Sequence, residues 1–131
     1  CREAADTYAH ADGSSPEEVE DNVRRFVEEG YRHIRVQMGG YGGSEAQIQK
    51  PDGAISGSYF DPKSYMRRTL LMLEHVRAAV GEEIELLHDV HERLTPSDAI
   101  SFAKKVEPFN LFFLEDALAP EDNAWFARML Y

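Results

Sequence analysis

The chain has 131 residues, of which 43% are hydrophobic, and this length and apolar content suit a folded domain rather than a disordered segment. Its formal net charge of −10 repels phosphate backbones and anionic lipid, which argues against nucleic-acid or membrane-surface binding. The single cysteine, Cys1, cannot form an intrachain disulfide, and no apolar run approaches the length of a membrane span. We therefore expect a reduced, cytoplasmic setting.

The first part of the chain predicts a strand followed by a helix. A short strand is expected over residues 7–11. Ser15 then serves as a helix N-cap, with Pro16 at the first helical position and Glu18 as the glutamate of a capping box. The helix has apolar residues at helical spacing and ends at Gly30, which favours a left-handed stop.

A second strand is expected over residues 33–38, where apolar and polar side chains alternate and Arg35 and Gln37 share one face. A helix capped by Asp61 follows it. The connection between them, residues 39–60, is glycine-rich and then polar, and it is much longer than such loops normally need to be. It is a candidate lid or site wall, or alternatively a surface insertion.

Two further strands are expected over residues 84–91 and 110–115. Thr95 caps the helix between them, and Pro120 opens a fourth helix. Four strand-helix units in succession predict a parallel sheet with right-handed crossovers.

Four such units make half of an eight-stranded barrel. The alternative is an open doubly wound sheet, but the turn after the first strand, residues 12–15, lacks the usual phosphate-binding glycines. A half-barrel exposes strand edges and an unfilled interior, so we expect the chain to be part of a larger protein. We also expect both ends of the chain to be cut. The predicted fold class is α/β, with a partial barrel domain over residues 1–131 that holds the first four strand-helix units of a (β/α) TIM-type barrel.

Ionisable side chains follow apolar ones at the carboxyl ends of the third and fourth strands. Alternation places Asp89 and His91 on the face of Leu87, and Glu115 on the face of Phe113. Parallel barrels carry their active sites at this end. Two converging carboxylates without a nearby cysteine suit a hard cation such as Mg²⁺, and the histidine beside them is available for proton transfer.

Each candidate has a structural alternative. Asp89 and Glu115 could instead form buried ion pairs with Arg35 or Arg93, because charges at a barrel mouth need partners. His10, on the first strand, could simply donate a hydrogen bond within the barrel.

Four segments, taken in order, resemble the barrel of the enolase superfamily, in its mannonate dehydratase subgroup. They are residues 8–13 (Tyr-Ala-His-Ala-Asp-Gly), 34–39 (Ile-Arg-Val-Gln-Met-Gly), 88–93 (His-Asp-Val-His-Glu-Arg) and 113–116 (Phe-Leu-Glu-Asp). The resemblance covers nearly the whole chain and implies a capping domain and further barrel units outside it. It also implies Mg²⁺ held by three acidic residues on consecutive strands. Asp89 and Glu115 match the first two, and the third would lie beyond Tyr131.

The resemblance implies a hydro-lyase that dehydrates a mannonate-type sugar acid to a 2-keto-3-deoxy acid through an enediolate. It gives His91 an acid/base role and makes His10 a substrate contact. It also implies that Arg35 on the second strand holds a loop tyrosine as the phenolate that acts as base. Tyr41 is our candidate for that tyrosine, and Tyr59 is its rival.

Two other functions stay open. One is dehydration of gluconate or another acid sugar by a member of the same superfamily. The other is a regulatory or sensing protein that retains the metal scaffold without a working base. In each case we expect a small sugar acid as ligand and a homo-oligomer, with no nucleic-acid or membrane partner. We expect the 131-residue chain on its own to be inactive.

Overall fold

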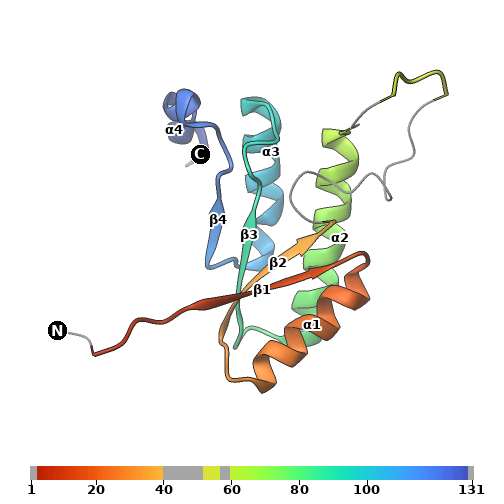
Figure 1. Ribbon diagram of the computed structural model, residues 1–131. Coiled ribbons are helices and arrows are strands. Elements are labelled where there is room, and N and C mark those ends of the chain that lie inside the picture. The colour runs from red at the N-terminus through yellow and green to blue at the C-terminus, as the bar shows by residue number, and fades with distance from the viewer. Residues whose placement is uncertain (1–2, 40–51, 57–59, 130–131) are drawn as a thin grey trace.

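The computed structural model describes residues 3–39, 52–56 and 60–129. Four strands form one parallel sheet in the order β1-β2-β3-β4 (Figure 1). Their bounds are β1 (Tyr8–Gly13), β2 (His33–Met38), β3 (Glu85–Asp89) and β4 (Phe113–Glu115). Strands that follow one another in the chain are neighbours throughout this sheet. In a doubly wound sheet, by contrast, the order of the strands reverses at a switch point. The sheet therefore has the predicted barrel topology.

The helices that connect the strands lie side by side. The three longest are α1 (Pro16–Glu28), α2 (Pro62–Val80) and α3 (Pro96–Val106). Helix α1 contacts α2, and α2 contacts α3, so the three cover the same face of the sheet. No helix in the described ranges is long and apolar enough to cross a membrane.

Each of these helices begins as the sequence predicts. Ser15, Asp61 and Thr95 accept hydrogen bonds from first-turn backbone N–H groups, and a proline follows each cap. One detail of the predicted capping box differs. The Glu18 carboxylate accepts from the backbone N–H of Ser14 at 2.8 Å, so the reciprocal bond is made one residue before the cap.

Strand β3 is shorter than predicted. It ends at Asp89, because His91 and Glu92 have φ angles of 57° and 56°, in the left-handed region and outside the extended conformation of a regular strand. The expected strand over 84–91 was therefore wrong at its end, and alternation along the strand does not place His91.

The other differences also occur at element ends. Strand β4 begins at Phe113 rather than at residue 110, because a 3-10 turn, η2 (Glu107–Phe109), ends in a left-handed Asn110 with φ 47°. Strand β1 continues past residue 11 to Gly13. Pro120 opens a 3-10 turn, η3 (Pro120–Trp125), and a single short helix, α4 (Phe126–Met129), follows it.

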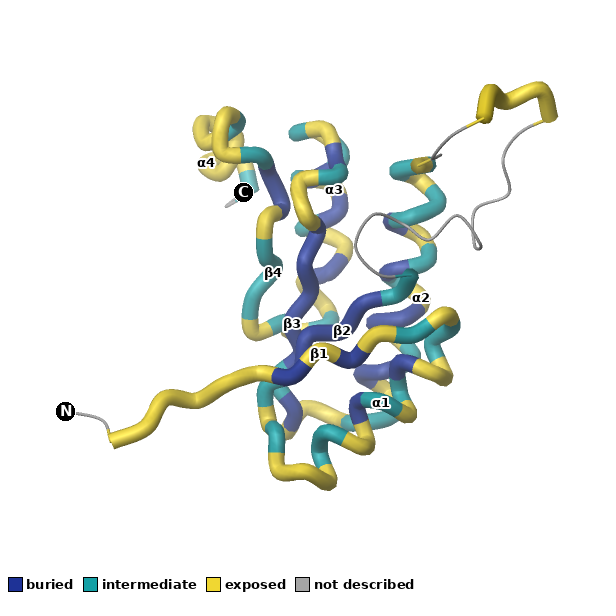
Figure 2. The backbone as a smooth tube through the Cα atoms, viewed as in Figure 1, coloured by how far each residue is buried: buried dark blue, intermediate teal, exposed yellow. Residues whose placement is uncertain are grey.

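The core lies between the sheet and the helices. It consists of apolar side chains from alternate strand positions and from the inner stripes of the helices; fully buried members include Ala11, Val19, Val23, Ile34, Val36, Met72, Leu73, Val76, Leu86 and Phe102. The opposite face of the sheet is more open (Figure 2), and there Tyr8 is 36% exposed and Phe112, just before β4, is 55% exposed. That face is the interior of the predicted barrel.

Candidate active site

One residue from each strand forms a connected row, which runs from the middle of β1 and β2 to the carboxyl ends of β3 and β4. The Arg35 guanidinium on β2 donates through Nη1 to Asp89 Oδ2 on β3 at 3.2 Å and to Glu115 Oε2 on β4 at 3.0 Å. Its Nη2 lies 3.1 Å from His10 Nδ1 on β1. A guanidinium has no acceptor, so His10 accepts this bond through Nδ1. The structure thus brings together four of the residues that the sequence selects.

The strand register produces this row. His10 is the β1 partner of Arg35, and Asp89 is the β3 partner of Glu115. The β2–β3 ladder ends at Arg35 and Leu87, whereas the β3–β4 ladder continues to the end of both strands. The Arg35 side chain therefore contacts Asp89 on β3 beyond the last backbone pair between β2 and β3.

The positive charge of Arg35 is compensated by the two carboxylates of the row. The side chain of Arg35 is 9% exposed, that of Asp89 is 4% exposed and that of Glu115 is 34% exposed. Carboxylate partners stabilise the buried charge of the Arg35 guanidinium, and both partners here approach the same nitrogen. Arg35, one of the two alternative ion-pair partners, contacts both carboxylates. The guanidinium of the other, Arg93, lies 5.7 Å from the centre of the Tyr65 ring.

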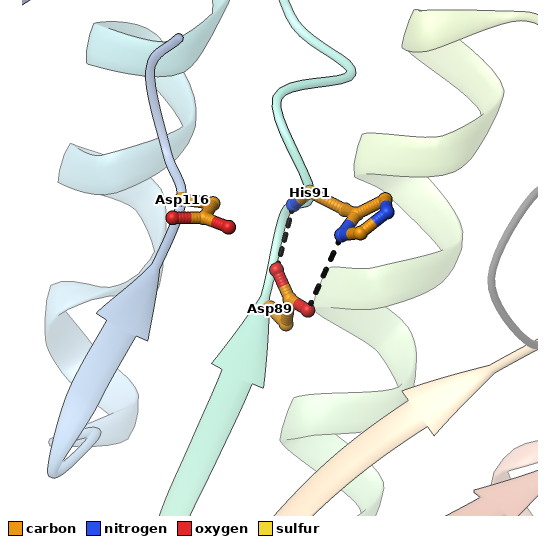
Figure 3. Close-up of side chains that lie close together, drawn as sticks. All are labelled: Asp89, His91 and Asp116. Carbon is orange, nitrogen blue, oxygen red and sulfur yellow. Dashed lines mark hydrogen bonds and ion pairs between the residues drawn. The ribbon is translucent and has the colours of Figure 1, made fainter. Parts of the chain in front are cut away.

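His91 approaches Asp89 because of the turn that follows β3. Asp89 Oδ1 accepts from the His91 backbone N–H at 2.8 Å, and His91 Nδ1 lies 3.6 Å from Asp89 Oδ2 (Figure 3). The His91 side chain is 55% exposed. The prediction that these two side chains are neighbours was thus correct, but the left-handed turn, and not the pleat of a strand, is the cause.

Asp116 is a further acidic group that sequence reasoning did not select. It follows Glu115 in the chain with a φ of 44°, and its carbonyl accepts from the Glu92 backbone N–H at 2.9 Å. One ligand atom each from Asp116, Asp89 and His91 lie within 4.8 Å of one another. In the sequence, the adjacent Glu-Asp pair could have pointed to Asp116. Its side chain comes close to Asp89 only because of a backbone angle that the sequence does not reveal.

A buried histidine supports the row from behind. His88 is 1% exposed on the helix side of β3, and its Nδ1 lies 2.8 Å from the Val36 carbonyl, so Nδ1 carries the proton and donates. Its Nε2 accepts from the Tyr65 hydroxyl of α2 at 2.9 Å. Burial lowers the pKa of His88 to about 4, and burial also raises the pKa of Tyr65. His88 is therefore neutral and joins β3 to β2 just beyond the last pair of their ladder.

The donors in this region fit a hard divalent cation. Asp89, Glu115 and Asp116 offer carboxylate oxygens, the ligands that Mg²⁺ prefers, and no cysteine is near them in the sequence. Tyr41 and Tyr59 lie outside the described residues. Toward the amino ends of the strands, the same face has a pocket of about 250 Å³ lined in part by Tyr8, Leu87 and Phe113.

Several known proteins are similar to this chain in sequence. Residues 18–129 match the family described as enolase C-terminal domain-like. A D-galactonate dehydratase family member from Enterocloster bolteae is 49% identical over 132 residues, which cover 98% of this chain and 33% of that protein. A D-galactonate dehydratase family member from Paenibacillus sp. is 47% identical over 135 residues, again covering 98% of this chain and 33% of that protein.

A solved structure shows the same arrangement of elements. The crystal structure of an enolase from Pantoea ananatis, with bound D-gluconate and Mg, has a TM-score of 0.89 and 40% sequence identity to this chain. The match covers 99% of this chain and 35% of that one. The chain thus spans about a third of the length of its relatives. It belongs to the enolase C-terminal domain-like family and forms part of that family's TIM-barrel domain.

Proposed function

We propose that the protein containing this chain dehydrates a sugar acid to a 2-keto-3-deoxy acid through an enediolate. The observation that carries the proposal is the row of His10, Arg35, Asp89 and Glu115, one from each strand. Its two carboxylates end β3 and β4, and barrels carry their active sites at this end of the strands. Relatives named as D-galactonate dehydratase family members support the reaction class.

Asp89 and Glu115 would hold Mg²⁺ in this proposal, as the resemblance implies, and Asp116 is a third carboxylate close to Asp89. When bound, Mg²⁺ would offset the negative charge that develops on the substrate carboxylate as the neighbouring proton is removed. The bound Mg of the Pantoea ananatis structure supports this choice of cation.

The chain's own residues would transfer protons and bind the substrate. Removal of the proton at the carbon next to the carboxylate requires a base. For this role we propose Tyr41, or its rival Tyr59, as the tyrosine that Arg35 would keep ionised. Loss of hydroxide from the neighbouring carbon requires a general acid. His91 is half-exposed beside Asp89 with its Nδ1 facing the carboxylate, so we propose that its Nε2 delivers that proton. His10 would contact the substrate.

Within this reaction class we propose a mannonate-type aldonate as the substrate. The alternative is gluconate or another aldonate, which is supported by the gluconate bound to the Pantoea ananatis enolase and by the galactonate in the names of the relatives. We also propose that the intact protein is a cytoplasmic homo-oligomer.

A single set of assays tests the proposal. The intact protein is incubated with Mg²⁺ and a panel of aldonic acids that includes mannonate, gluconate and galactonate, and 2-keto-3-deoxy product is measured. We expect one or more aldonates to be dehydrated. If no aldonate yields product and the proton next to the carboxylate does not exchange with solvent, the regulatory or sensing alternative replaces the enzyme.

Two variants separate the proposed roles. Asp89→Asn should weaken Mg²⁺ binding and abolish activity, because it removes one carboxylate charge from the site. His91→Asn should abolish dehydration while Mg²⁺ affinity stays near that of the wild type. Asp21→Asn, at an exposed position of α1, removes the same charge far from the site and should change neither property. Wild-type Mg²⁺ affinity and activity in Asp89→Asn would favour a purely structural ion pair with Arg35.

A further inference from the structure

Gln37 on β2 has a buried side-chain amide that the described residues leave without a hydrogen-bond partner. Its residue is 1% exposed, and within the described part of the chain neither its Nε2 nor its Oε1 has a hydrogen-bond partner. Both atoms are shielded from solvent, so bulk water does not satisfy them either. Most buried polar side-chain atoms are hydrogen-bonded, and leaving an amide unpaired destabilises the fold. An apolar side chain of similar length would avoid that cost, so the amide calls for another explanation.

The position of Gln37 relates it to the candidate active site. Alternation along β2 places it on the same face as Arg35, and two residues closer to the carboxyl end of the strand. Arg35 on that face reaches His10, Asp89 and Glu115. The Gln37 side chain turns about several single bonds, so its amide can reach a ligand above the row while the backbone stays in place.

The hydrogen-bonding capacity of the amide indicates which ligand group it suits. A carboxylate only accepts hydrogen bonds, so it could pair with the amide nitrogen but would leave Oε1 unsatisfied. A hydroxyl both donates and accepts, and a pair of neighbouring hydroxyls can satisfy both ends of an amide. The polyhydroxyl part of a sugar acid therefore fits Gln37 better than its carboxylate does.

We infer that Gln37 is a substrate-binding residue whose amide hydrogen-bonds hydroxyl groups of the sugar acid. This inference rests on the proposed function and adds a specificity-determining contact to it. It also accounts for the unpaired amide, since a group that is poorly paired in the free protein becomes paired when ligand binds. A shielded amide of this kind should discriminate strongly against a substrate that lacks the matching hydroxyl.

The test uses the intact enzyme and measures stability and kinetics together. Gln37→Met keeps the length of the side chain and removes the amide. Without ligand, its melting temperature should equal or exceed that of the wild type, because an unpaired buried amide has been removed. The KM for the best aldonate of the panel should rise about tenfold, the usual effect of losing one uncharged hydrogen bond, while kcat changes less. KM is then measured with aldonates that each lack one hydroxyl. For the aldonate that lacks the hydroxyl bound by Gln37, the variant and the wild type should have the same KM.

Asn22 provides a matched control, because its amide is used by the fold. Its Nδ2 donates to the carbonyl of Asp12, which is the β1 partner of Gln37, at 2.8 Å. Asn22→Leu should therefore lower the melting temperature and leave KM unchanged, the opposite pattern to Gln37→Met.

The outcomes separate this inference from the proposed function. A wild-type enzyme that dehydrates no aldonate overturns the proposed function and this inference with it. Turnover by the wild type, combined with an unchanged KM or a lowered melting temperature in Gln37→Met, overturns the inference alone and assigns the amide to the fold.

Discussion

At the scale of single residues, the central feature is that one guanidinium joins residues of three other strands. Arg35 contacts two carboxylates and an imidazole, so much of its charge is already compensated within the sheet. A nearby tyrosine that relies on Arg35 to stay ionised would share the cation with Asp89 and Glu115. The proposed base therefore depends on a residue that also supports the proposed metal site.

The pH dependence of the reaction tests this arrangement. If Arg35 holds Tyr41 as a phenolate, the rate should rise with pH through an apparent pKa below the reference tyrosine value of about 10, because a cation favours the ionised form. In a pH–rate profile of the intact enzyme, Tyr41→Phe should remove this rise and Arg35→Met should move it to higher pH. Tyr59→Phe should leave it in place. A rise that disappears only in Tyr59→Phe would transfer the role to that residue.

His88 should make the stability of the protein sensitive to acid. Its pKa is lowered to about 4 by burial, whereas an unfolded chain has a histidine pKa of about 6.5. Between these values the unfolded state binds more protons than the folded state, so the free energy of unfolding falls as the pH drops from 6.5 toward 4. The full shift corresponds to about 3 kcal/mol.

Urea unfolding of the intact protein at pH 7 and pH 4.5 measures this effect. His88→Asn lacks the titrating ring but keeps a side-chain N–H that can donate to the Val36 carbonyl. The wild type should lose about 2 to 3 kcal/mol more than this variant between the two pH values, since other titrating groups are common to both. Equal losses would show that His88 is not held neutral in the folded protein.

At the scale of elements, α1 and the end of β1 approach each other closely. A Cβ atom built on Gly13, the last residue of β1, would lie 2.7 Å from the Val19 backbone nitrogen and 2.9 Å from Val19 Cγ2. Gly13 is thus required for its small size, because α1 passes directly over the end of the strand.

Gly13→Ala should therefore destabilise the protein by about 1 to 3 kcal/mol, the usual cost of overpacking. Chemical denaturation measures the change. Adding Val19→Ala should not restore stability, since the nearer atom belongs to the backbone of the helix. Full recovery in the double variant would mean that only the valine side chain obstructs the new methyl group.

A second feature at this scale is the divergence of β3 from β2. The ladder between them ends at Arg35 and Leu87, and beyond it two side-chain contacts continue the connection. One is the His88 bond to the Val36 carbonyl on the helix side, and the other is the Arg35 bond to Asp89 on the inner face. Beyond the ladder, the ends of β2 and β3 are therefore joined by these side-chain contacts and not by backbone pairs.

At the scale of the whole molecule, four strands present an inner face that the described residues leave partly open. Phe112 and Tyr8 remain 55% and 36% exposed beside this face, and His10 is exposed although it contacts Arg35. The chain covers 33% of the length of its relative from Enterocloster bolteae. A closed barrel interior normally requires all of its strands.

The 131-residue chain, produced alone, should therefore not dehydrate any aldonate that the intact protein accepts. It should also bind a hydrophobic dye more strongly per mole than the intact protein does, because its inner face is exposed. Product formation by the isolated chain at a rate comparable to the intact enzyme would show that the remainder is not needed for the chemistry.

The sequence by itself determined the features that depend on neighbouring residues along the chain. Helix starts at Ser15, Asp61 and Thr95 follow from local capping chemistry, and the strand order follows from the alternation of strands and helices. Strand alternation also selected Asp89 and Glu115 as convergent carboxylates, because parallel strands align their carboxyl ends.

Only the tertiary structure decided the features that depend on pairs of residues far apart, or on single backbone angles. Arg35 meets Glu115 across a separation of 80 residues, and no local pattern specifies a guanidinium shared by two strands. His91 reaches Asp89 through a left-handed turn whose φ no periodicity reveals. The Gln37 amide has no hydrogen-bond partner among the described residues, and only the packed structure reveals this, because hydrogen-bond satisfaction depends on neighbours that are distant in the sequence.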